Sequence, residues 1–186
     1  MLIRAYWYFQ LGNKNVELLQ LRMEDIIKKI LDEREINALL VEYCRALDCM
    51  DLDAIANLFS DDCVVEFGTD EQLNSRGSKA LAKSLERMWR WKRTSHHLSN
   101  VIVHFTGSEK AFSKSYVHAW HERFDETTAT IYGQYHDELK RENGRWVITK
   151  RTMYMNGNDS GFKVKIFPFE RKSPPKNWLA PKIDEV

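Results

Sequence analysis

The chain has 186 residues, of which 43% are hydrophobic and 30% are charged. Its 28 basic and 27 acidic side chains leave a net charge of +1, so no strong field favours nucleic acid or an anionic membrane. No apolar run approaches the roughly 18 residues that cross a membrane. These features predict a soluble single domain with neither a nucleic-acid nor a membrane partner.

The three cysteines are Cys44, Cys49 and Cys63. An odd number without a Cys-x-x-Cys pair argues against a disulfide framework and against a zinc site. No spacing of histidines and carboxylates is specific enough to propose a metal. We therefore expect a reducing, cytoplasmic setting and no metal or other cofactor.

Residues 1–22 follow no core periodicity, whereas Met23 opens a helical pattern. Two interpretations remain open for 1–22: an arm that packs on a neighbour, or an extension upstream of the domain. We expect the domain at 23–158 and a C-terminal extension at 159–186. The extension carries apolar residues from Phe162 to Phe169 and is too apolar to be disordered throughout.

Residues 24–50 read as an amphipathic helix, which the charged residues 32–35 could interrupt. Its apolar stripe comprises Ile26, Ile27, Ile30, Leu31, Ile36, Leu39, Leu40, Tyr43, Cys44 and Leu47. Asp48 follows Cys44 by four residues, which places a carboxylate on or beside the buried face, where it needs a partner. Alternatively, Asp48 lies in a solvated turn, with Asp51 capping a helix at 52–59.

After a strand at 63–67, a third helix is expected over 78–91, with Leu81, Leu85, Met88 and Trp89 buried. Its basic and aromatic end, residues 87–93, could be a nucleic-acid patch, but the low net charge favours a solvated helix end.

The β-branched run 101–105 indicates a strand that extends back to His96. Strict alternation groups His96 with Leu98, Asn100, Ile102 and His104. The opposite face carries His97, Ser99, Val101, Val103 and Phe105.

Three further strands are expected at 111–124, 129–141 and 145–156, separated by turn signals. Helices followed by long strands predict an α+β domain with an antiparallel sheet that can curl around a pocket.

The order of these elements, with the segments "LFSDDCVVEFG", "TSHHLSN" and "YHDELKRENGRWVITKR", resembles the SnoaL-like branch of the nuclear-transport-factor-2-like superfamily over residues 24–156. The resemblance implies a cone-shaped α+β fold in which three N-terminal helices and a curved, mostly antiparallel sheet enclose a pocket. The superfamily includes enzymes and non-enzymes.

Scytalone dehydratase and gamma-hexachlorocyclohexane dehydrochlorinase, two trimeric members of this branch, eliminate small groups with an Asp/His dyad. The resemblance implies that Asp48 and His96 form such a dyad, with His97 as the alternative base. It also matches His121 to a second active-site histidine and Arg151 to a catalytic arginine.

The substrate-binding residues expected from the resemblance and the helical stripe are Tyr43, Leu47, Phe67, Trp89 and Tyr135. Leu47 and Phe67 replace the two carbonyl-polarising tyrosines of the dehydratase. Tyr43 replaces the catalytic lysine of the dehydrochlorinase. The substrate is therefore expected to differ from those of both enzymes.

The function that follows is a cofactor-independent lyase that abstracts a proton from a small, largely apolar cyclic substrate. An isomerase or polyketide cyclase with the same base remains open, as does a non-catalytic subunit such as the small subunit of a ring-hydroxylating dioxygenase. A homo-oligomer is expected, with a trimer favoured over a dimer.

Overall fold

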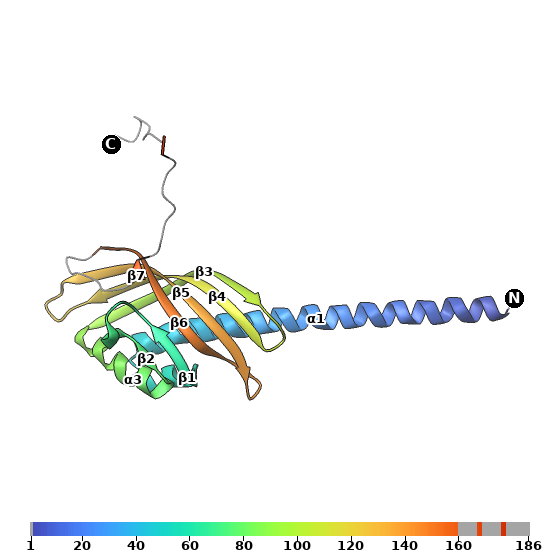
Figure 1. The fold of residues 1–186 in the computed structure, drawn as a ribbon, viewed down its shortest axis with the longest axis horizontal. Helices are drawn as coiled ribbons and strands as arrows, with labels where there is room; N and C mark the ends of the chain where they lie inside the picture. Colours follow the sequence, from blue (N-terminus) through green and yellow to red (C-terminus); the bar gives the residue numbers. More distant parts are fainter. Residues whose placement is uncertain (1, 160–166, 169–175, 178–186) are drawn as a thin grey trace.

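The computed structural model describes residues 2–159, 167–168 and 176–177 of the chain (Figure 1). The helices are α1 (Leu2–Asp48), α2 (Leu52–Asn57) and α3 (Ser78–Leu85), with 3₁₀ turns η1 (Glu71–Leu73) and η2 (Glu86–Arg90). The strands are β1 (Phe59–Glu66), β2 (Ser75–Arg76), β3 (Arg93–Phe105), β4 (Lys110–Glu122), β5 (Thr128–Glu142), β6 (Arg145–Asp159) and β7 (Phe167–Pro168).

The sheet is open and curved, and its strands follow the order β2-β1-β6-β5-β4-β3, with β7 added beside β6. All pairings are antiparallel except β1 with β6 and β6 with β7. On β4, Ala111, Val117 and Ala119 are buried, whereas Phe112 and Tyr116 on the opposite face are exposed. The mixed α+β fold and the largely antiparallel sheet expected from the sequence are confirmed.

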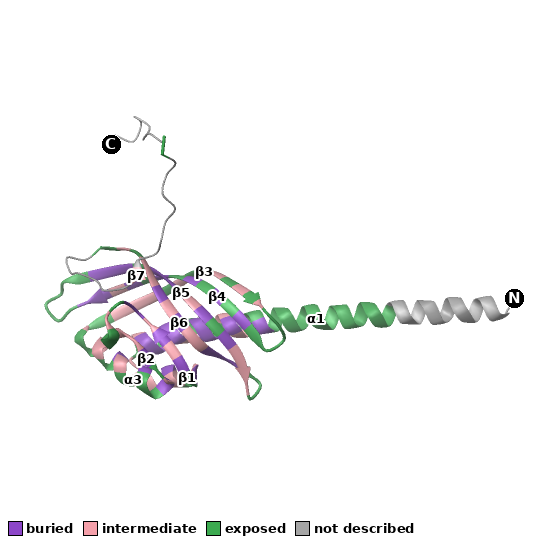
Figure 2. Ribbon diagram, in the orientation of Figure 1, coloured by how far each residue is buried: buried purple, intermediate pink, exposed green. Residues whose placement is uncertain are grey.

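Helix α1 runs without a break past Met23 and through residues 32–35 (Figure 1). Figure 2 shows that its first half extends away from the sheet and is exposed where it is described. Ile26, Ile27, Ile30 and Leu31 were expected in the core, but they are exposed because the sheet meets α1 only further along. The buried stripe begins at Ile36.

Two contacts mark the point where α1 reaches the sheet. Arg141 of β5 donates a hydrogen bond to Asp32, and the backbone N–H of Trp146 donates to Glu35 at 3.0 Å. The charged residues 32–35, which could have interrupted the helix, instead fasten it to the β5–β6 hairpin.

The alternation expected along β3 holds only as far as Asn100. Asn100 has φ +51°, and the β3–β4 register shifts between Ser99 and Ile102. This β-bulge places two residues of β3 opposite one of β4, which reverses the faces that follow. Val103 therefore packs on the core, whereas Ile102 is exposed.

The helix expected over 78–91 is shorter than the pattern indicated. Helix α3 ends at Leu85 and continues as the 3₁₀ turn η2, which has three residues per turn rather than 3.6. The change of period turns Trp89 outward, where it is 60% exposed, while Met88 packs against the core.

Within the described residues, no helix combines the length and the apolar character needed to span a lipid bilayer. Of the apolar tail, Phe167 pairs with Tyr154 in the β6–β7 ladder, whereas Phe162 and Phe169 lie outside the described residues.

Candidate active site

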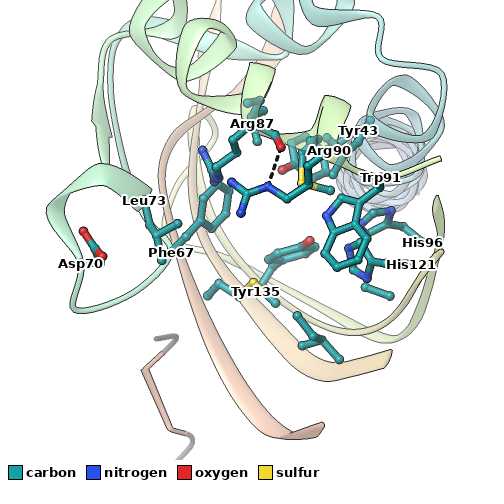
Figure 3. A pocket seen from close by; sticks show the side chains of 16 residues that line it. Tyr43, Phe67, Asp70, Leu73, Arg87, Arg90, Trp91, His96, His121 and Tyr135 are labelled. Carbon is teal, nitrogen blue, oxygen red and sulfur yellow. Dashed lines mark hydrogen bonds between the residues drawn. The ribbon is translucent and has the colours of Figure 1, made fainter. Parts of the chain in front are cut away.

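A cavity of about 330 Å³ lies between the end of α1, the turn η2 and the inner face of the sheet. Figure 3 shows His96 and His121 on one side of it, beside Trp91, and Phe67 and Leu73 on the other. Most of its wall is aromatic or aliphatic, a composition typical of sites for small organic ligands.

Asp48 is the last residue of α1 and faces the start of β3. Its Oδ1 accepts hydrogen bonds from Thr94 Oγ1 at 2.7 Å and from His96 Nδ1 at 2.6 Å. Its Oδ2 accepts the backbone N–H of His96 at 2.9 Å. The solvated turn considered for Asp48 is thus replaced by a carboxylate held by three hydrogen bonds from β3.

Burial alone would raise the pKa of Asp48, but the hydrogen bonds from His96 and Thr94 outweigh it and lower the pKa. Asp48 is therefore ionised near neutral pH and can only accept hydrogen bonds. The proton in its contact with His96 must then reside on Nδ1, and in the neutral ring Nε2 carries the free lone pair. The imidazole is 4% exposed and lines the cavity.

His121 of β4 packs beside His96, with the two ring centroids 5.4 Å apart and the rings nearly perpendicular. Its Nδ1 is buried without a hydrogen-bond partner, and the ring of Trp91 lies 4.8 Å away. Burial, reinforced by the charge of His96, lowers the pKa of His121 to about 4. His121 is therefore a neutral imidazole that lines the cavity.

His97, the alternative base, lies on the opposite face of β3. Its Nε2 is 2.8 Å from Ser95 Oγ, and its ring is 6.2 Å from that of His118. Its side chain is exposed and is not part of the cavity wall. Of the two histidines, only His96 lines the cavity and contacts Asp48.

Arg151, expected among the catalytic residues, does not line the cavity. It is fully buried on β6 and forms a bidentate ion pair with Asp137, with Nε–Oδ1 at 2.7 Å and Nη2–Oδ2 at 2.9 Å. Its guanidinium carbon lies 4.1 Å from the ring centroid of Tyr43 and 4.2 Å from that of Tyr135. Arg151 therefore packs against Tyr43 and Tyr135, which line the cavity, without lining it itself.

Tyr43, Leu47, Phe67 and Tyr135, all expected as substrate-binding residues, line the cavity. Trp89 does not, because η2 turns it outward, and Trp91 occupies the wall instead.

Arg87 and Arg90 also line the cavity, although the sequence did not predict them as site residues. Their position in a basic run that looked like a solvated helix end concealed them. Asp137 was missed as the partner of Arg151 because the two residues lie on different strands, paired across the β5–β6 ladder. Among the described residues, no group of three or more His, Cys, Asp or Glu side chains is placed to hold a metal ion.

The fold and this site define a pocket protein of the SnoaL-like class. The chain matches the SnoaL-like domain over residues 28–152 and belongs to that family. No curated protein matches it.

Three solved structures are similar to this chain. A protein assigned as a scytalone dehydratase from Novosphingobium aromaticivorans is 26% identical, with a TM-score of 0.75 over 80% of this chain and 99% of its own. The type 3 hexachlorocyclohexane dehydrochlorinase LinA from Novosphingobium barchaimii is 18% identical, with a TM-score of 0.64 over 80% and 99%. A protein assigned as an aromatic ring hydroxylase from N. aromaticivorans is 24% identical, with a TM-score of 0.61 over 67% and 88%.

Proposed function

We propose that this protein is a cofactor-independent lyase in which His96 removes a proton from carbon and Asp48 orients the imidazole. The observation that carries the proposal is the 2.6 Å contact between Asp48 Oδ1 and His96 Nδ1 at the wall of a largely apolar cavity. The similarity to a protein assigned as a dehydratase and to a dehydrochlorinase supports elimination as the reaction.

Asp48 on α1 and His96 on β3 have different roles in the proposed dyad. Asp48 fixes the tautomer so that the lone pair is on Nε2, and it stabilises the imidazolium that forms when Nε2 takes the proton. General-base help of this kind accelerates a reaction by roughly 10²- to 10⁴-fold. The aromatic and aliphatic wall favours a small, largely apolar cyclic substrate.

A leaving group or a developing oxyanion also needs a hydrogen-bond donor, and Tyr43, Tyr135 and His121 line the same cavity. Burial raises the pKa of both phenols more than the nearby Arg151 lowers it, so both keep their protons. Arg151 supports them from behind without touching the substrate. We therefore assign the phenols and His121 as donors, and Arg151 as the residue that positions Tyr43 and Tyr135.

The test uses cyclic compounds that carry a hydroxyl or halide leaving group one carbon away from an acidified C–H. The wild-type protein should release the leaving group, and His96→Ala should lose at least roughly a hundredfold of the rate. His97→Ala is the matched control, because it removes the neighbouring imidazole on the other face. Equal activity of His96→Ala and the wild type would refute the proposal. Products of unchanged mass would indicate isomerisation by the same base.

We also propose that the chain forms a homo-oligomer, with a trimer favoured. The outer face of β3, β4 and β5 exposes Ile102, Phe112, Tyr116 and Tyr132, an apolar surface of the kind that interfaces cover. Light scattering at micromolar concentration tests this, and a monomer would contradict it.

A further inference from the structure

Two arginines of η2 face an otherwise largely apolar cavity, and the dyad mechanism gives them no role. Arg87 and Arg90 both line it, and in Figure 3 their side chains extend toward Phe67 rather than toward His96 and His121. The side chain of Arg90 reaches across the cavity toward Phe67. The Arg87 guanidinium carbon lies 5.6 Å from the centroid of the Phe67 ring.

Within the described part of the chain, the hydrogen bonds of both guanidiniums go to neutral oxygen atoms. Arg87 Nη1 donates to the backbone carbonyl of Ser84 at 2.6 Å and to its hydroxyl. Arg90 Nε donates to the carbonyl of Arg87 at 2.8 Å. In contrast, the buried Arg151 pairs with Asp137 through two hydrogen bonds.

The electrostatics of this end of the cavity favour an anion. Burial lowers the pKa of Arg87, which means that its charged form is held at a cost, and Arg90 adds a second like charge nearby. The acidic lining residue Asp70 lies on the η1 loop, away from both arginines in Figure 3, and its Oδ1 accepts the backbone N–H of Gln72. A negatively charged oxygen group between the two guanidiniums would offset the cost.

We propose that the substrate of this cavity is a small ring acid, whose carboxylate binds Arg87 and Arg90 while its acidic C–H faces His96. The inference rests on the proposed lyase function for the position of the C–H, but the carboxylate subsite stands on the two arginines alone. It sets the orientation of the substrate: anionic end at η2, reacting carbon at the dyad. A guanidinium also matches the planar geometry of a carboxylate, which favours this anion over a spherical one.

The experiment compares two probes of nearly equal shape, 2-naphthoate and its neutral analogue 2-naphthamide, by calorimetric titration of the full chain. The wild type should bind the carboxylate roughly 10- to 100-fold more tightly, the range of a hydrogen bond to a charged group. Arg90→Met should remove most of that preference. This variant is the safer one to fold, because Arg90 is exposed, whereas Arg87 also bonds the last turn of α3.

Two controls separate this inference from the lyase proposal. Lys83→Met removes one positive charge from the outer face of α3 and should leave the preference unchanged, because Lys83 pairs with Glu86 and does not line the cavity. His96→Ala should also keep the preference although it loses catalysis.

Four results would overturn the carboxylate subsite. The first two are equal binding of the two probes by the wild type and a preference that survives both Arg87→Met and Arg90→Met. The other two are a preference that disappears with His96→Ala and no binding of 2-naphthoate at about 1 mM. If the arginine variants lowered turnover while the wild type bound both probes equally, the arginines would serve the transition state and the ring-acid proposal would be wrong.

Discussion

Replacing Asp48 by asparagine should invert the tautomer of His96. The backbone N–H of His96 can only donate, so it requires the amide oxygen at the position of Oδ2, 2.9 Å away. The amide nitrogen then occupies the position of Oδ1 and donates to His96 Nδ1, which must become an acceptor. The proton moves to Nε2, and the ring presents N–H instead of a lone pair to the cavity.

The expected loss of turnover is roughly 10²- to 10⁴-fold, because general-base help disappears while the side chain keeps its shape. The free energy of unfolding should fall by only about 1–3 kcal/mol, the range for exchanging hydrogen bonds to a charged group. Thr94 can rotate its hydroxyl to accept from the new amide, so this hydrogen bond is kept with its direction reversed.

A long-range ¹H–¹⁵N spectrum of the imidazole measures the tautomer directly and needs no substrate. Asp51→Asn is the matched control, since it makes the same change at the N-cap of α2, where Asp51 accepts the backbone N–H of Ala54. A proton still on Nδ1 of His96 in folded Asp48→Asn, or an unchanged turnover, would refute the proposed role of Asp48.

Arg151→Met should cost about 3–5 kcal/mol of unfolding free energy in a denaturant titration by stranding the buried carboxylate of Asp137, and adding Asp137→Leu should recover most of it. Lys150→Met is the control, because the ion pair of Lys150 with Glu66 is partly exposed, and it should lower the free energy of unfolding by less than about 1 kcal/mol. An equally small loss for Arg151→Met would contradict the structural role of Arg151. The unfolded chain protonates His121 near pH 6.5 whereas the folded chain does so only at about 4, so stability should fall by up to about 3 kcal/mol as the pH is lowered through this window. Thermal melts of His121→Phe should show a smaller loss, and an identical pH profile would exclude this linkage. Asn100→Val should lose about 1–2 kcal/mol at the left-handed bulge position, whereas Asn100→Gly should fold as well as the wild type.

The sequence predicted those features of the fold that depend on one helix or one strand alone. The buried stripe from Ile36 to Leu47 and the long strands follow from periods that core packing imposes. The partner of Asp48 came from the family resemblance, because residues 48 and 96 meet only in the folded chain.

The wrong predictions fall where the repeat of a helix or strand changes along the chain, or where a residue's burial depends on a segment distant in sequence. Alternation could not reveal the bulge at Asn100, and a helical stripe could not reveal that the helix tightens after Leu85, which exchanges Trp89 for Trp91. The exposed stretch of α1 from Val16 to Leu31 carries apolar side chains like those of the buried stretch that begins at Ile36, and only the extent of the sheet distinguishes the two.

The turn η2, with the residue after it, brings Arg87, Met88, Arg90 and Trp91 to the cavity within five consecutive positions. Asp48 and His96, the pair proposed to abstract the proton, come from other parts of the chain, at the end of α1 and the start of β3. Changes in one short segment can therefore alter which molecule is accepted while the reactive machinery stays intact. Because substrate contacts and the Asp48–His96 pair lie on different segments, a few mutations in η2 can change the substrate without changing the pair. The turn η2 is therefore the first segment to randomise in a directed-evolution library.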